Sequence, residues 1–175
     1  LRYYLEYLLK NGYNQEFFIE GGRSRSGKLR YPKYGLLKYY VQALVRGVVN
    51  DIYIAPISIC YDTVAESSAY TKEQTGGKKK RESISDLLNI KKALKKSYGC
   101  AYVEFGESFS LKGYMNGANF DPASASEQEM RQFLKKLSFQ IMREIDKVSI
   151  VTPVSLVATA LLSAKTSGMY IDELK

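Results

Sequence analysis

Residues 52–61 read Ile52-Tyr53-Ile54-Ala55-Pro56-Ile57-Ser58-Ile59-Cys60-Tyr61, a run that is apolar almost throughout and rich in β-branched and aromatic side chains. Such a composition predicts a strand that is buried on both faces. Pro56 has no N–H to donate to a sheet ladder, so we expect a bulge or a strand end at this residue. The run lies between helical patterns over 33–49 and 83–96, and a further strand is predicted over 100–105.

Helical and strand patterns alternate through the rest of the chain. Apolar residues at helical spacing predict a helix from Leu1 to Asn11-Gly12 and another over 126–147. The inward stripe of the longer helix is predicted to be Met130, Phe133, Leu134, Leu137, Ile141 and Ile145. A short strand is expected at Phe17–Ile19, and Thr152-Pro153 begins a last helix. This alternation predicts an α/β fold with a mixed, partly parallel sheet flanked by helices.

The composition limits the chemistry available to the chain. Its 175 residues include 26 Lys and Arg against 18 Asp and Glu, a net charge of +8 that favours an anionic partner. No histidine is present, which excludes an imidazole base, nucleophile or metal ligand from these residues. Cys60 and Cys100 lie far apart in apolar runs, so we expect two buried thiols and no metal site.

The segment Phe17-Phe18-Ile19-Glu20-Gly21-Gly22-Arg23-Ser24-Arg25-Ser26-Gly27-Lys28-Leu29 carries most of the chemistry. An apolar run ends in two glycines, which allow a ligand to approach the backbone closely. Two arginines, a lysine and two hydroxyls follow, and guanidinium groups bind phosphate oxygens in a bidentate manner. We expect Glu20 to orient one arginine while the other contacts a phosphorylated ligand.

A phosphate-binding loop of the nucleotide-hydrolase kind is one alternative interpretation. Gly22 to Lys28 fits G-x-x-x-x-G-K and follows a predicted strand. However, Leu29 stands where a serine or threonine would hold magnesium, and the next helix is predicted to begin only after Pro32. The pattern therefore matches a degenerate nucleotide-binding loop at most.

The same residues resemble a known family. Phe18-Ile19-Glu20-Gly21-Gly22-Arg23-Ser24-Arg25-Ser26-Gly27-Lys28 is similar to the F-x-E-G-G-R-S-R-x-G-K block of glycerol-3-phosphate acyltransferases, both bacterial membrane-bound enzymes and their mitochondrial relatives. Pro32-Lys33-Tyr34-Gly35 resembles the P-K-x-G segment that follows in the family. Residues 55–62 resemble a later V-P-I-x-I-x-Y-E block. The resemblance covers about residues 15–165.

The resemblance implies transfer of a fatty acyl group from a thioester to the sn-1 hydroxyl of glycerol 3-phosphate, the first step of phospholipid synthesis. The implied substrate-binding residues are Glu20, Gly21, Gly22, Arg23, Ser24, Arg25, Gly27, Lys28 and Pro56. The family's catalytic H-x-x-x-x-D block is absent from this chain, so we expect it upstream of Leu1 and assign no catalytic residue here. Residues 1–150 would be the C-terminal part of the catalytic domain, incomplete at its N-terminal side, and 151–175 the start of a helical segment.

The resemblance also implies partners. The donor would be acyl-CoA or acyl-carrier protein, with no separate cofactor, and the enzyme would lie peripherally on the cytoplasmic side of the cell membrane. The favoured interpretation of the cationic runs Lys78–Arg81 and Lys91–Lys96 is a solvated loop and helix face, and contact with acidic headgroups is the alternative. A basic nucleic-acid-binding module is the other alternative. We expect no nucleic acid, because the aromatic residues are not interleaved with the cations in a recognition pattern.

Overall fold

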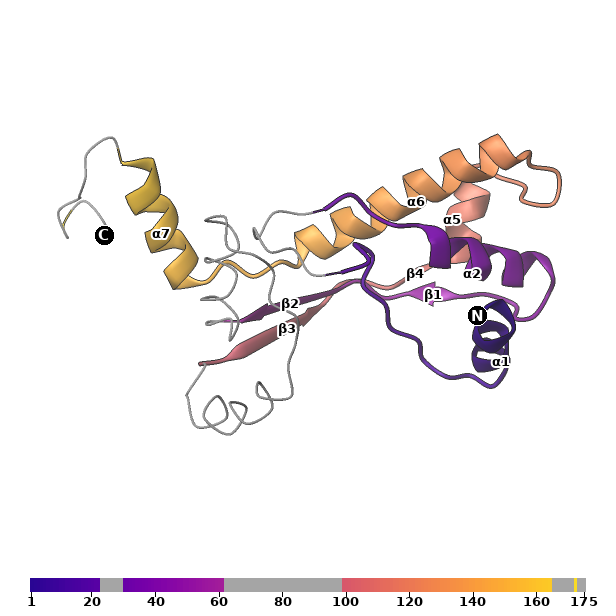
Figure 1. Cartoon of the computed structure of the whole chain (residues 1–175), viewed down its shortest axis with the longest axis horizontal. Coiled ribbons are helices and arrows are strands. Elements are labelled where there is room, and N and C mark those ends of the chain that lie inside the picture. Colours follow the sequence, from indigo (N-terminus) through magenta and orange to yellow (C-terminus); the bar gives the residue numbers. More distant parts are fainter. Residues whose placement is uncertain (23–29, 62–98, 165–171, 173–175) are drawn as a thin grey trace, which may run out of the picture. The chain divides into compact units, whose positions relative to one another are not determined.

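The computed structural model describes residues 1–22, 30–61, 99–164 and 172, which fall into two compact units. The first unit comprises residues 1–58 and 105–148, and the second comprises 59–104 and 149–175. The helices and strands are coloured along the sequence in Figure 1. Their bounds are α1 Arg2–Lys10, α2 Gly35–Val45, β1 Tyr53–Ile54, β2 Ile57–Tyr61, β3 Ala101–Phe105, β4 Phe109–Ser110, α5 Leu111–Gly117, α6 Glu127–Lys147 and α7 Pro153–Ser163.

Helices α1 and α2 end in the same way, at a glycine with a left-handed backbone. Gly12 has φ +73°, and its N–H and that of Tyr13 donate to the carbonyls of Leu9 and Leu8, each at 3.0 Å. Gly47, with φ +67°, ends α2 through the equivalent pair of bonds. These bonds satisfy carbonyls that the helices leave unpaired. The helix predicted over 33–49 is therefore shorter, because Gly47 ends it.

The longest helix, α6, begins at the serine that the sequence predicts. Ser126 caps it through a capping box, in which the Ser126 hydroxyl accepts from Glu129 N at 3.3 Å and Glu129 Oε2 accepts from Ser126 N at 2.8 Å. The predicted stripe is confirmed: Phe133, Leu134, Leu137 and Ile141 are buried, and Met130 and Ile145 pack against them. The four stripe residues join a core with Leu5, Ile19, Leu37, Tyr40, Val41, Leu111 and Met115.

Asp51 joins the start of β1 to the start of α5. Its Oδ1 accepts from Ile52 N at 2.7 Å and from Lys112 N at 3.1 Å, while Ser110 Oγ donates to Oδ2 at 2.5 Å. The Ser110 hydroxyl in turn accepts from Gly113 N at 2.7 Å and so caps α5. β1 and β4 pair antiparallel beside this network, with Tyr53 opposite Ser110. Neither β4 nor α5 was predicted from the sequence.

The mixed α/β class is confirmed, but the strands differ from the prediction. Phe17–Ile19 is not a strand, because the Ile19 carbonyl bonds to Lys33 outside any ladder. Pro56 splits the predicted strand 52–61 into β1 and β2, as expected of a residue without an N–H. The described strands form two-stranded sheets, β1 with β4 and β2 with β3, and show none of the predicted parallel pairing.

Burial of the strands and the cysteines also differs from the prediction. Tyr53 is 70% exposed and Tyr61 is 55% exposed, because two-stranded sheets leave a face without a covering layer. Cys100 is exposed and Cys60 is only partly buried, so the expectation of two buried thiols is wrong. Apolar neighbours in the sequence indicated burial that these short sheets do not provide.

The second unit contains α7, which Thr152 caps by accepting from Ser155 N at 3.2 Å. Pro153 occupies the first turn of the helix, where its missing N–H costs nothing. Within the described ranges, none of the helices combines the length and hydropathy that a membrane span requires. The helix predicted over 83–96 and the cationic runs at 78–81 and 91–96 lie outside the described residues.

We predict that Asp51→Asn destabilises the fold by about 1–2 kcal/mol at neutral pH, because an amide nitrogen would face groups that donate to the carboxylate. Burial raises the pKa of Asp51, but hydrogen bonds from Ser110, Lys112 N and Ile52 N, with the Lys112 charge, outweigh it, and the net pKa is lowered. A lowered folded-state pKa contributes stability above the unfolded-state pKa of about 3.9, which is lost as the pH falls through the folded-state value.

Urea unfolding followed by circular dichroism, between neutral and acidic pH, measures this difference. The difference in the free energy of unfolding between the wild type and Asp51→Asn should shrink as the pH falls below about 4. Asp146→Asn is the matched control, since Asp146 is exposed on α6, and it should change the free energy of unfolding by less than about 0.5 kcal/mol. Equal losses in the two variants would contradict the role given to Asp51.

Candidate functional site

The residues Glu20, Gly21 and Gly22 form a turn at the end of the 17–19 segment. Gly21 has φ +66°, a left-handed backbone that glycine adopts without strain, and its N–H donates to the Phe18 carbonyl at 2.8 Å. Glu20 and Gly22 are half-buried and Gly21 is exposed. The turn therefore lies at the protein surface, and its predicted role in ligand binding stays a prediction.

The core holds this turn through the segment that precedes it. Ile19 is buried, and the Phe17 ring stacks on the Tyr40 ring of α2 with centroids 5.9 Å apart and planes 23° apart. The Tyr40 hydroxyl donates to Gln15 Oε1 at 3.0 Å. Burial raises the pKa of Tyr40, so its hydroxyl keeps the proton that it donates. Helix α2 thus fixes residues 15–19 and the start of the turn.

A backbone hydrogen bond joins residues 30–33 to the segment that precedes the glycine turn. Lys33 N donates to the Ile19 carbonyl at 2.8 Å, which brings residues 30–33 beside the turn although seven residues between them are not described. A methyl group built on Gly21 would lie 2.5 Å from Lys33 Cδ and 3.3 Å from Lys33 Nζ. One built on Gly22 would lie 3.6 Å from Arg30 Nη1. Two cations thus lie against the two glycines.

Arg30 and Lys33 are the functional candidates that the sequence analysis missed. Lys33 is part of the P-K-x-G segment, but neither spacing nor composition indicated that it lies against Gly21. The other predicted cations and hydroxyls, Arg23, Ser24, Arg25 and Lys28, lie outside the described residues together with Gly27. For these positions the sequence prediction stays a prediction.

Pro56 lies at the break between β1 and β2 rather than on the glycine turn. It is fully buried, and its carbonyl accepts from Gly106 N at 2.8 Å. A methyl group on Gly106 would lie 3.3 Å from both Pro56 Cβ and the Pro56 carbonyl oxygen, so a residue without a side chain fits best there. These contacts give Pro56 a structural role in joining the two strand segments, and its predicted role beside the substrate stays a prediction.

Comparison with known proteins identifies the family. Residues 70–175 match the family described as the C-terminal region of glycerol-3-phosphate acyltransferase, and residues 1–60 match an acyltransferase family. The chain belongs to the glycerol-3-phosphate acyltransferase family. The resemblance inferred from the Glu20–Lys28 block is therefore confirmed.

Individual relatives agree with the family match. The chain is 35% identical over 178 residues to a glycerol-3-phosphate acyltransferase of Pasteurella multocida, and 36% identical over 181 residues to one of Pseudomonas putida. A protein of the same name from Haemophilus influenzae is 35% identical over 177 residues. The matches cover 97–99% of this chain but only 21–22% of each relative, so the chain spans about a fifth of their length.

We predict that Gly21→Ala destabilises the protein by about 1–2 kcal/mol, because alanine is strained at φ +66° and its Cβ displaces the Lys33 side chain. Gly22→Ala is the matched control. The Cβ added at Gly22 would make ordinary van der Waals contact with Arg30. The Tm of Gly22→Ala should therefore fall less than that of Gly21→Ala. Thermal unfolding of the two variants measures the difference, and equal Tm values would contradict the geometry described for Gly21.

Proposed function

We propose that this chain is part of a glycerol-3-phosphate 1-O-acyltransferase and binds the phosphate of glycerol 3-phosphate. The observation that carries the proposal is the convergence of Lys33 and Arg30 on the Gly21-Gly22 turn. Glycines admit a phosphate close to the backbone, and the two cations offer charge-assisted hydrogen bonds to its oxygens. Family membership supports the acceptor and the reaction class.

The proposed reaction is acyl transfer from a thioester, either acyl-CoA or acyl-carrier protein, with no separate cofactor. The sn-1 hydroxyl oxygen attacks the thioester carbonyl carbon, an ester C–O bond forms and the C–S bond breaks. The hydroxyl proton finally resides on the released thiol. We assign no base to this chain, which contains no histidine. Its residues act by holding the phosphate so that the hydroxyl at the far end of the acceptor is correctly placed.

The two alternatives from the sequence have less support. A nucleotide-binding loop would continue directly into a helix, whereas α2 begins only at Gly35. A nucleic-acid-binding module would explain the charge of +8 but not the family match. Binding of the acceptor phosphate would explain why two cations, Arg30 and Lys33, lie against the glycine turn.

We predict that Lys33→Ala, in the complete enzyme, raises the KM for glycerol 3-phosphate roughly 10- to 100-fold, the effect of losing one charge-assisted hydrogen bond. The KM for the acyl thioester should stay unchanged, because the proposal assigns this lysine to the acceptor phosphate alone. Lys38→Ala is the matched control, since Lys38 lies on α2 and faces Glu127 at 4.0 Å. An unchanged acceptor KM in Lys33→Ala would exclude Lys33 from the phosphate site.

A second variant tests the predicted loop itself. Arg25→Ala should also raise the acceptor KM, and the double variant with Lys33→Ala should lose less than the product of the two single effects if both bind one phosphate. Steady-state kinetics with the acceptor as the varied substrate measures this coupling. Unchanged kinetics in Arg25→Ala would remove that arginine from the site.

A further inference from the structure

Tyr40 of α2 makes two contacts with the segment that precedes the glycine turn. It is only 7% exposed, its hydroxyl donates to Gln15 Oε1 at 3.0 Å, and its ring stacks on that of Phe17. Within the described part of the chain, residues 14–17 form no backbone hydrogen bond. The position of these residues on α2 therefore depends on side-chain contacts, and Tyr40 makes two of them.

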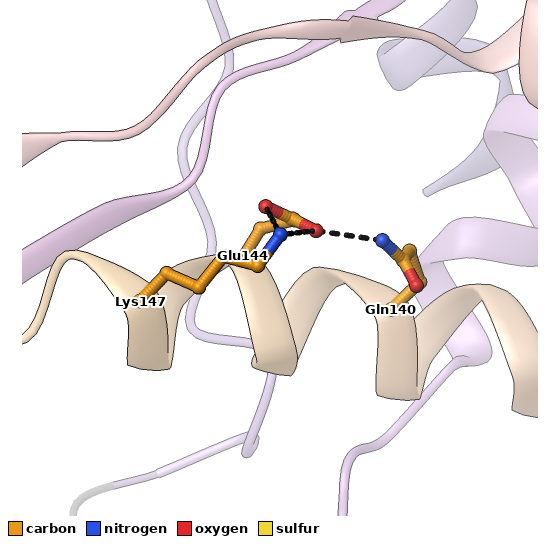
Figure 2. Close-up of polar contacts among 3 residues, drawn as sticks. All are labelled: Gln140, Glu144 and Lys147. Atoms are coloured by element: carbon orange, nitrogen blue, oxygen red, sulfur yellow. Dashed lines mark hydrogen bonds and ion pairs between the residues drawn. The ribbon is translucent and has the colours of Figure 1, made fainter.

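The side-chain amide of Gln15 is only half satisfied. Its oxygen accepts from Tyr40, but its Nε2 is buried and has no hydrogen-bond partner among the described residues. Gln140 on α6 shows the usual arrangement, since its Nε2 donates to Glu144 Oε1 at 2.7 Å, and Lys147 pairs with the same carboxylate (Figure 2). A buried donor without a partner costs about as much free energy as a neutral hydrogen bond contributes. The bond between Tyr40 and Gln15 therefore adds little net stability, and what it fixes is geometry.

The hydrogen bond fixes a distance that the stacked rings leave free. Apolar contact is non-directional, so Phe17 by itself would slide along Tyr40 with little loss of buried area. A hydrogen bond, in contrast, weakens steeply when its length or angle departs from the preferred values. The Tyr40 hydroxyl thereby sets where Gln15 lies along α2.

The other end of the same segment is fixed next to the same helix. The Ile19 carbonyl accepts from Lys33 N at 2.8 Å, and α2 begins at Gly35, two residues after this lysine. A contact at Ile19 alone would let the segment rotate about that bond, and the glycine turn would rotate with it. The second contact, at Tyr40, sets the direction in which the segment enters the turn.

We propose that Tyr40 is a positioning residue for the phosphate site of the proposed function, on which this inference rests. Its hydroxyl, bound to Gln15, orients the segment that leads to Gly21 and Gly22 and so sets the place of the turn relative to the Lys33 cation. A phosphate held by both backbone N–H groups and a lysine needs both within hydrogen-bond reach at once. A displacement of the turn by about 1 Å would therefore weaken binding, although the buried Tyr40 itself acts only through the turn.

The first test removes the hydroxyl and keeps the ring. In the complete enzyme, Tyr40→Phe should raise the KM for glycerol 3-phosphate roughly 3- to 10-fold, the effect of one neutral hydrogen bond, and leave the KM for the acyl thioester unchanged. Tyr114→Phe is the matched control, because Tyr114 packs partly buried against the same core but lies on α5, outside residues 15–33. An acceptor KM that is normal in Tyr40→Phe, or equally raised in both variants, would overturn the proposal.

The second test separates positioning from stability. Gln15→Met removes the acceptor of the hydrogen bond together with the unpaired Nε2, so the double variant of Gln15→Met and Tyr40→Phe should have a Tm close to that of the wild type. Its acceptor KM should nevertheless stay as high as in Tyr40→Phe, because no directional contact then fixes the segment. Gln140→Met removes a paired amide from α6 and should leave the acceptor KM unchanged. An acceptor KM that returns to the wild-type value together with the Tm would show a purely structural role and overturn the proposal.

Lys33→Ala distinguishes the failure of this proposal from the failure of the proposed function. In the Lys33→Ala background, Tyr40→Phe should raise the acceptor KM by a smaller factor than in the wild type, because the cation whose distance it sets is gone. Equal factors in the two backgrounds would overturn the positioning role. A raised acceptor KM in Lys33→Ala with a normal one in Tyr40→Phe would overturn the positioning role and leave the proposed function intact. An unchanged acceptor KM in Lys33→Ala would overturn both.

Discussion

The backbone hydrogen bond from Lys33 N to the Ile19 carbonyl fixes the geometry of the candidate site. Ile19 is buried in the core, so its carbonyl is a fixed point to which residue 33 returns. The bond brings Arg30 and Lys33 beside Gly21 and Gly22, where a side chain on Gly21 would collide with the lysine. Without this bond, Arg30 and Lys33 would have no fixed position relative to Gly21 and Gly22.

Helix α2 holds the segment that contains the Ile19 carbonyl in place. Leu37, Tyr40 and Val41 face the core, and Tyr40 also stacks on Phe17 and donates to Gln15. The segment before the turn therefore needs no sheet ladder to be held in place. This explains how residues with the composition of a strand occupy a fixed position without strand pairing, and why the turn that follows can remain at the surface.

Helix α6 divides the first unit into an interior and a charged exterior. Its apolar stripe closes the core beside α2 and α5 (Figure 1), and its other side carries lysines, an arginine and an exposed phenylalanine. One amphipathic sequence thus supplies both the buried stripe and the charged exterior of the unit. The carboxylate of Glu144 is paired with Lys147 on the same helix, which leaves the neighbouring cations unopposed by it.

Local sequence patterns were enough to predict most of the described helices, the start of α6 at Ser126, the strand break at Pro56 and the family. These features follow from rules of spacing and hydrogen bonding that neighbours along the chain satisfy. Burial of the strands, the position of Phe17–Ile19 and the contacts of Asp51 with Ser110 depend instead on partners far away in the sequence. The approach of Lys33 to Gly21 also depends on the folded chain. Sequence periodicity shows which side chains are apolar, but it does not show which distant backbone groups a side chain contacts after folding.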